Sequence, residues 1–205
     1  VVAPSNAHDA KGCMIASIRD NNPVIFIEHR ALYHTDAIVP EHPFTVEFGQ
    51  ARTLRQGDDI TIVGISNMVA ECLRAQELVA EIGISAEVID PISLVPLDME
   101  TIIASTRRTG RLLVVDNAWT RAGASAEIVA AVAERLSAAQ RIQVARMGFA
   151  ATPCPTTSAL EKEFYPSPAT IATKVHRMVR PDDAEWEPDA EKAALTYQLA
   201  FRGPF

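Results

Sequence analysis

The sequence has few cysteines, no cluster of basic residues and no long apolar run, and each shortage excludes a class of protein. Its three cysteines, Cys13, Cys72 and Cys154, lie far apart without a CxxC pair. Neither a disulfide framework nor a zinc site is therefore indicated, and a reducing, cytoplasmic location is expected. No apolar stretch approaches the roughly 20 residues of a membrane span. The net charge of −7 and the scattered basic residues argue against a nucleic-acid surface.

The clearest fold signal is a βαβ unit between Asp58 and Asp98. Residues Ile60–Ile65 are a β-branched run, typical of a strand buried on both faces. From Asn67 to Ile82 apolar residues recur at helical spacing, and Gly83 supplies a stop. Ala86–Ile89 is a second apolar run. Because a helix intervenes, the two strands should be parallel with a right-handed crossover.

Predicted strands and helices alternate through the rest of the chain, which indicates an α/β fold. Further strands are expected within Thr45–Leu54, Leu112–Val115 and Ile142–Met147, and further helices within Asp98–Arg107, Ala122–Leu136, Ser158–Phe164 and Pro168–Val179. The segment from Arg180 to Phe205 is acidic and then apolar, so a mostly extended tail with one short helix is expected.

The opening residues form one predicted helix and one predicted strand. Ser5 is expected to cap a helix that reaches Ile18, and Val24–Ile27 has the composition of a fully buried strand. Two elements cannot bury themselves, so we interpret them as the last unit of a preceding domain whose remainder is missing. Residues 31–43, with two prolines and no clear period, are interpreted as a linker.

Polar residues follow the three central predicted strands, where doubly wound folds place ligands. They are Ser66-Asn67, Asp90 and Asp116-Asn117. No GxGxxG or Walker lysine accompanies them, so helix capping by Ser66 and a turn at Asp90 are favoured over a phosphate site. His29, at a predicted strand end, is the histidine best placed for catalysis, although an ordinary surface role is favoured.

A turn after the first predicted helix could hold a cation. Asp20 and Asn22 could supply oxygen ligands to a hard cation together with carbonyl groups of the helix end. From the residues alone, a plain helix cap is favoured over a cation site.

Six ordered segments together resemble the β subunit of the thiamine-diphosphate-dependent 2-oxo acid dehydrogenases of the pyruvate, branched-chain and acetoin complexes. The segments are DAKGCMIASIRDNNPVIFIEHRALY, the following VP, TIVGISNMVAECLRAQELVAEIGISAEVIDPISLVPLDMETI, GRLLVVDNAW, GASAEIVAAVAE and PCPTTSALEKEFYPSPATI. The resemblance covers about Val1 to Val179. It implies that residues 1–30 end a truncated pyrimidine-binding domain, 31–43 are a linker, 44–179 are a transketolase C-terminal-like domain and 180–205 are a tail.

The resemblance also implies a fold and an activity. The fold is a three-layer α/β/α domain whose sheet is mostly parallel with one antiparallel edge strand. The full enzyme would oxidatively decarboxylate a 2-oxo acid and pass the acyl group to lipoamide, with thiamine diphosphate and Mg²⁺ as cofactors. The family's catalytic and cofactor-contacting residues precede this segment or lie on the α subunit, so no catalytic or cofactor-binding residue is expected here.

For this segment the resemblance implies assembly. Expected partners are the α subunit and a second β subunit, forming a heterotetramer, and the acyltransferase core of the complex. It also implies a monovalent cation, commonly potassium, held by the carbonyl groups of Ser17 and Ile18 and by Asp20 and Asn22.

Two departures from the family pattern stand out. Residues 150–155 read AATPCP where many members have Asp-x-Pro-x-Pro, and the tail beyond Val179 is longer than usual. Two alternatives remain open: a stand-alone, non-catalytic interaction module, and part of a transketolase or deoxyxylulose-phosphate synthase. The second would need basic residues near strand ends to hold a sugar phosphate, and Arg107, Arg121 and Arg146 are the candidates.

Overall fold

A computed structural model describes residues 1–189 and 192, and contains a five-stranded sheet with strand order β1-β3-β2-β4-β5. Four neighbouring strands of this sheet run parallel to one another: β2 (Ile60–Gly64), β3 (Ala86–Asp90), β4 (Arg111–Val115) and β5 (Gln143–Met147). At one edge β1 (Arg52–Arg55) pairs antiparallel with β3. The expected mostly parallel sheet with one antiparallel edge strand is confirmed.

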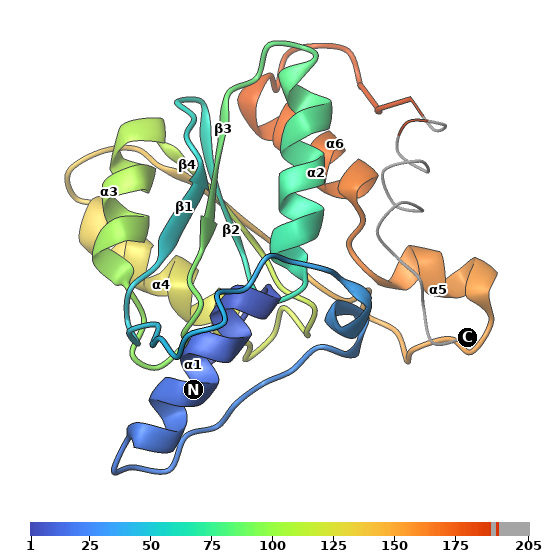
Figure 1. Ribbon diagram of the computed structural model, residues 1–205. Coiled ribbons are helices and arrows are strands. Elements are labelled where there is room, and N and C mark those ends of the chain that lie inside the picture. Colours follow the sequence, from blue (N-terminus) through green and yellow to red (C-terminus); the bar gives the residue numbers. More distant parts are fainter. Residues whose placement is uncertain (190–191, 193–205) are drawn as a thin grey trace.

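Helices cover both faces of the sheet and produce the expected three layers (Figure 1). One face is covered by α2 (Met68–Ala80) and α6 (Pro168–Val179), and the other by α3 (Met99–Thr109) and α4 (Ala124–Leu136). The helix α5 (Ser158–Phe164) leads into α6. None of the helices among the described residues is long and apolar enough to cross a membrane.

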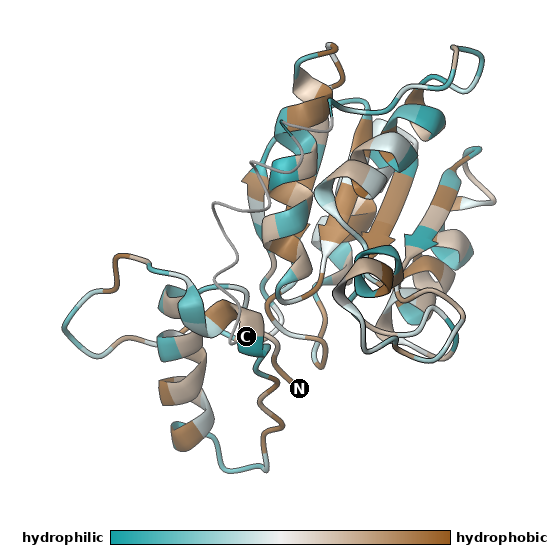
Figure 2. Cartoon of the chain, turned by 90° about the vertical axis from the view of Figure 1, so that its right-hand side faces the viewer, coloured by the Kyte–Doolittle hydropathy of each residue, from teal (hydrophilic) through white to brown (hydrophobic). Residues whose placement is uncertain are grey.

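Side-chain alternation along the strands builds a separate apolar core on each face. Ile62 of β2 packs with α2 and α6, whereas its neighbour Val63 packs with α3 and α4. Every residue of β2 and β3 is buried, because helices lie against both of their faces. Figure 2 shows the resulting apolar strands between helices whose outer surfaces are mixed in polarity.

Local capping chemistry explains where the helices end. Asp98 accepts a hydrogen bond from the Thr101 amide, 3.1 Å away, at the start of α3. Gly83 and Gly110 follow α2 and α3 with φ of 75° and 70°, a left-handed conformation that favours glycine. These stops agree with the predictions from the sequence.

Two predictions for the opening residues are wrong. Asn6, not Ser5, caps α1 (Ala7–Arg19), because its side chain accepts from the Asp9 amide. The Val24–Ile27 segment is not a fully buried strand. It forms one bridge, between Phe26 and Val2, and alternate side chains are exposed, Ile25 by 63% and Ile27 by 41%. No described residue covers the exposed side chains of Ile25 and Ile27.

Three other segments differ from the predictions in detail. A short 3-10 helix, η1 (Arg30–His34), overlaps the start of the predicted linker, and regular pairing begins at Arg52 rather than near Thr45. In the tail, Trp186 packs against the apolar core beneath α2 and α6. The predicted tail helix lies mostly outside the described residues. The division of the chain at residues 30, 43 and 179 stays a prediction.

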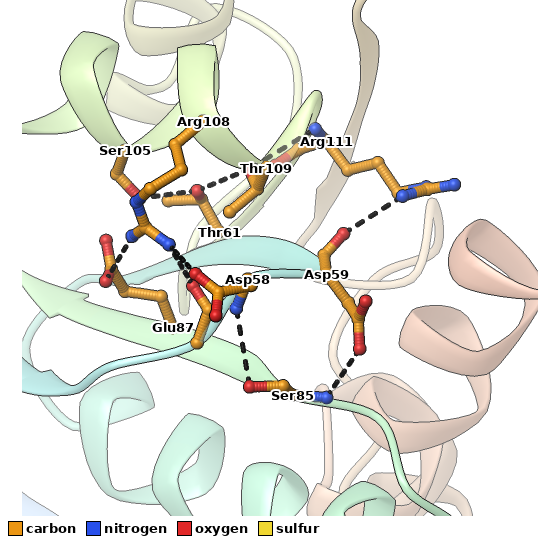
Figure 3. Close-up of polar contacts among 10 residues, drawn as sticks. Asp58, Asp59, Thr61, Ser85, Glu87, Ser105, Arg108, Thr109 and Arg111 are labelled. Carbon is orange, nitrogen blue, oxygen red and sulfur yellow. Dashed lines mark hydrogen bonds and ion pairs between the residues drawn. The ribbon is translucent and has the colours of Figure 1, made fainter.

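A polar network joins the elements at the edge where β2 and β3 begin (Figure 3). Arg108 of α3 contacts Glu87 of β3 with a nitrogen to oxygen distance of 2.6 Å, and Glu87 is buried. The hydroxyl of Thr61 on β2 lies 2.6 Å from the Ser105 hydroxyl and 2.9 Å from the Thr109 hydroxyl. These polar contacts join α3 to the sheet at the amino-terminal edge of the parallel strands. The opposite, carboxyl edge holds the candidate functional site.

Candidate functional site at the carboxyl edge of the sheet

Backbone strain collects at the carboxyl edge of the parallel strands. Ser66, Ile92 and Ala122 have φ values of 54°, 58° and 53°, and they are the non-glycine residues with positive φ in the described chain. They lie in the loops that follow β2, β3 and β4. Such conformations cost about 1–3 kcal/mol each and persist only where surrounding structure holds them.

Ser66 is also unusual in its side chain. The residue is 7% exposed, and its hydroxyl has no hydrogen-bond partner among the described residues. The predicted cap by Ser66 is wrong, because the N-cap residue of α2 is Asn67 and this helix has no side-chain cap bond. The buried Asn67 Oδ1 atom likewise has no partner in the described chain. Unpaired buried groups call for an explanation, such as bound water.

His29 reaches the same edge from the N-terminal segment. Its Nε2 atom lies 2.7 Å from Nδ2 of Asn117, whose Oδ1 atom has no partner in the described chain, and its Nδ1 atom accepts from the Ala31 amide at 3.3 Å. A neutral imidazole that accepts at Nδ1 carries its proton on Nε2, so Asn117 should present its oxygen to this ring. Burial lowers the pKa of His29 and favours this neutral form.

Asp90, at the end of β3, lies in a buried polar cluster together with Asp9 of α1. Both carboxylates are fully buried. Asp90 accepts from the Ser5 hydroxyl and from the Ile92 amide, the latter at 2.9 Å, which confirms its predicted turn. The two terminal guanidinium nitrogens of Arg52, on β1, each lie 2.9 Å from one carboxylate oxygen of Asp9. These contacts fasten α1 to the sheet.

Asp116, at the end of β4, is a third buried carboxylate at this edge. It is 9% exposed, burial raises its pKa, and no Lys or Arg of residues 1–189 pairs with it. Burial likewise raises the pKa of Glu71, in the first turn of α2. Perturbed pKa values concentrate at functional edges and interfaces.

An aromatic groove of about 340 Å³ lies beyond the ends of β4 and β5. Trp119, Arg121 and Phe149 are among its lining residues. Trp119 is 48% exposed and packs edge-on against Phe149 and Phe164, with ring centroids 5.7 and 6.1 Å apart. Most of the lining is apolar, so the groove suits apolar contact better than a phosphate group.

The three arginines suggested for a sugar phosphate do not gather at one site. Arg121 and Arg146 are near each other, since the Arg146 guanidinium donates to the carbonyl of Thr120. Arg107 instead lies in the last turn of α3, just before β4 begins, at the opposite edge of the sheet. This separation removes the geometric support for the sugar-phosphate alternative.

The candidate cation residues lie at the end of α1. Asp20 is the C-cap residue, and its Oδ1 atom accepts from the Asn22 amide and side chain at 2.7 and 3.0 Å. Ser17 donates its hydroxyl to the Cys13 carbonyl. Within the described residues no group of three or more His, Cys, Asp or Glu side chains could hold a metal ion, but carbonyl oxygens lie outside that criterion.

Sequence reasoning missed the Asp9, Arg52 and Ser5 contacts entirely. Arg52 and Asp9 are 43 positions apart, and Ser5 and Asp90 are 85 apart. A local pattern cannot reveal such pairs. The one available signal was an acidic residue near a helix start beside small polar residues, which an ordinary cap explains equally well.

The chain is similar to known proteins over most of its length. Residues 49–171 match the family described as transketolase, C-terminal domain. The chain is 40% identical over 180 residues to the acetoin:2,6-dichlorophenolindophenol oxidoreductase subunit beta of Cupriavidus necator, covering 88% of this chain and 53% of that protein. It is 46% identical over 136 residues to the pyruvate dehydrogenase E1 component subunit beta of Bacillus subtilis, covering 66% of this chain and 42% of the relative.

A solved structure, titled split gene transketolase, inactive beta4 tetramer, has a similar fold. The TM-score is 0.71 at 26% identity, covering 87% of this chain and 56% of that one. The chain thus spans about half the length of the curated relatives and of the solved structure that it matches.

Proposed function

The chain belongs to the transketolase C-terminal domain family, and from that membership we propose that it is the C-terminal part of the β subunit of a thiamine-diphosphate-dependent 2-oxo acid dehydrogenase. The observation that carries the proposal is the 40% identity to an acetoin oxidoreductase β subunit over 88% of the chain. In the complete enzyme, a 2-oxo acid would be oxidatively decarboxylated and its acyl group passed to lipoamide.

The role of this segment in that enzyme is assembly. The carboxyl edge holds the N-terminal helix through Asp9, Arg52 and Asp90, and His29 reaches the same edge through Asn117. Asp116, Glu71 and Ser66 supply no nucleophile and base within hydrogen-bonding distance, because the Ser66 hydroxyl has no partner in the described chain. Thiamine diphosphate would supply the carbanion chemistry, and its ligands and Mg²⁺ would lie outside this segment.

The proposed partners follow from the β-subunit relatives. They are an α subunit, a second β subunit in a cytoplasmic heterotetramer, and the acyltransferase core. For docking we propose the aromatic groove beside Trp119 and residues 180–189, and the sequence departs from the usual family pattern at residues 150–155 and beyond Val179.

A monovalent cation, commonly K⁺ in the family, is proposed at the end of α1. The chemistry of the donors fits, since Asp20 offers a carboxylate beside carbonyl groups of the last turn, including those of Ser17 and Ile18, with Asn22 folded over it. A higher melting temperature in KCl than in choline chloride of equal ionic strength supports the site, provided that Asp20→Ala abolishes the difference.

The decisive experiment joins the chain to its upstream coding sequence. We expect that sequence to encode a glutamate-bearing pyrimidine-binding domain, and we expect the full subunit, with an α subunit and thiamine diphosphate, to oxidise pyruvate or acetoin with dichlorophenolindophenol as acceptor. Calorimetry should detect no thiamine diphosphate binding to the present chain alone. Tight binding by this chain, or a start codon immediately before Val1, would instead favour an independent module.

A further inference from the structure

The contact between α1 and the sheet contains more buried negative charge than positive charge. Asp9 and Asp90 are both fully buried, and they come from different elements, α1 and the end of β3. Arg52, the partner of Asp90 in the β1–β3 ladder, directs its guanidinium to Asp9 instead. Two buried carboxylates therefore lie beside one guanidinium, which contacts Asp9. We call the contact formed by Ser5, Asp9, Cys13, Arg52 and Asp90 the α1 joint.

The two carboxylates are stabilised unequally. Asp9 has a two-point contact with Arg52 and a hydrogen bond from the Asn6 side chain at 2.7 Å. Among residues 1–189, the donors to Asp90 are the neutral Ser5 hydroxyl and Ile92 amide. A buried charge without a counter-ion is costly, whereas a protonated carboxyl group can donate to the Ser5 oxygen. Of the two, Asp90 is the carboxyl group suited to hold a proton.

The remaining groups around the α1 joint do not cancel this charge. The Nδ1 atom of His8 lies 2.9 Å from Asp9, with the ring partly exposed. Glu47, on the segment before β1, is exposed and accepts from Gln50. Burial and the two carboxylates raise the pKa of Cys13 to about 11, so this thiol stays neutral. Val2, Cys13 and Ile92 form an apolar cluster at the joint, whereas Arg52 keeps 41% of its side chain exposed.

We propose that the α1 joint is proton-coupled: when α1 closes on the sheet, Asp90 takes up a proton, and the joint is tighter at mildly acidic pH than at neutral pH. The proposal rests on these contacts and not on the proposed enzymatic function. It makes α1, at the predicted boundary between two domains, a pH-responsive attachment.

The size of the effect follows from linkage. Burial, followed by the charge of Asp9, raises the pKa of Asp90 to about 6, against a reference value of 3.8. A raised carboxyl pKa stabilises the closed state at low pH, and that stabilisation is lost as pH rises towards 6. Between pH 7.5 and pH 5.0 the closing equilibrium should strengthen about tenfold.

Hydrogen exchange of the full 205-residue chain tests the proposal. The protection factors of the α1 amides, corrected for intrinsic exchange, should rise about tenfold more in the wild type than in Asp90→Asn as pH falls from 7.5 to 5.0. Both proteins keep His8, so the comparison isolates the change at position 90. The carboxamide introduced by Asp90→Asn can still accept from the Ile92 amide. Asp36→Asn, which removes an exposed carboxylate, should respond as the wild type does.

Equal responses in the wild type and Asp90→Asn would overturn the proposal. If Asp90→Asn does not fold, the carboxyl carbon of Asp90 can be titrated by NMR in the wild-type chain. A midpoint near 6 supports proton uptake at the α1 joint, and a midpoint near the reference value of 3.8 overturns it.

Discussion

At the scale of single residues, Ser66 combines a left-handed backbone with a buried hydroxyl that has no partner in the described chain. The Cβ atom of a serine makes this left-handed backbone unfavourable, and the unsatisfied hydroxyl oxygen adds a further free-energy cost. Glycine removes both terms and loses some backbone entropy in exchange. Ser66 is therefore a position where the chain is less stable than it could be.

We expect Ser66→Gly to raise the free energy of unfolding by about 1 kcal/mol. Ser66→Ala is the matched control, because it deletes the hydroxyl but keeps the Cβ atom and hence the backbone strain. Urea unfolding followed by circular dichroism measures both. If the alanine variant gains as much as the glycine variant, the hydroxyl and not the backbone is the cause.

The same residue shows why some predictions from sequence failed. A serine after a strand and before a helix predicts a cap, but a cap needs an extended backbone, and Ser66 has φ of 54°. Ser5 was likewise a reasonable candidate for the cap of α1. In the structure Asn6 is the cap, and the Ser5 hydroxyl donates to Asp90 instead. The error at Ser66 came from its own backbone conformation, and the error at Ser5 came with a contact 85 positions away in the sequence.

At the scale of elements, β2 and α2 approach each other closely at Gly64. A Cβ atom there would lie 2.8 Å from the Cα atom of Val69 and 2.9 Å from its amide nitrogen, both backbone atoms of α2. Backbone cannot move aside as a side chain can. The glycine in the predicted strand is thus required by the packing of α2 on β2.

Gly64→Ala should lower the free energy of unfolding by about 2–3 kcal/mol, the range expected for overpacking. Gly110→Ala is the control, since a Cβ atom there meets no atom of the described residues within 4 Å and only its φ of 70° is unfavourable. That variant should lose about 1 kcal/mol. Equal losses in chemical denaturation would mean that the β2–α2 contact is not rigid.

The Glu87–Arg108 contact is the second prediction at this scale. Glu87 has 6% of its side chain exposed and Arg108 has 43%. Arg108→Met should cost about 2 kcal/mol, because it leaves a buried carboxylate unpaired, although the exposed guanidinium limits the loss. Asp58, which also contacts Arg108, is 83% exposed, so Asp58→Asn should cost under about 0.5 kcal/mol. Thermal unfolding of both variants measures the difference, and similar losses would contradict this account.

Most of the elements could be predicted from local patterns. The period of apolar residues and the stops at Gly83 and Gly110 located α2 and α3, and Asp98 located the start of α3. The parallel order followed from the helix between β2 and β3. The site was predicted less well, because Asp9–Arg52 and His29–Asn117 are long-range pairs that no local period encodes.

At the scale of the whole molecule, the described chain is a three-layer domain with a projecting N-terminal unit (Figures 1 and 2). One side of that unit is well packed: a Cβ atom on Gly12 of α1 would lie 2.5 Å from a Val46 methyl group. Elsewhere on this unit Ile18 is 76% exposed and Ile25 is 63% exposed. An apolar surface of this kind is typical of a protein interface.

We expect the double variant Ile18→Glu, Ile25→Thr to keep the wild-type free energy of unfolding within about 0.5 kcal/mol, because exposed side chains contribute little to folding. The same variant should self-associate less than the wild type, which static light scattering over a range of concentrations will show. A variant carrying Leu160→Thr, which alters an apolar side chain on α5 that is 60% exposed, controls for general surface polarity. If self-association is equal in all three proteins, the surface responsible for it lies elsewhere. A large loss of stability would mean that Ile18 and Ile25 are packed within this chain. The predicted pattern, unchanged stability with less association, would mark this side of α1 as the surface that another polypeptide segment covers.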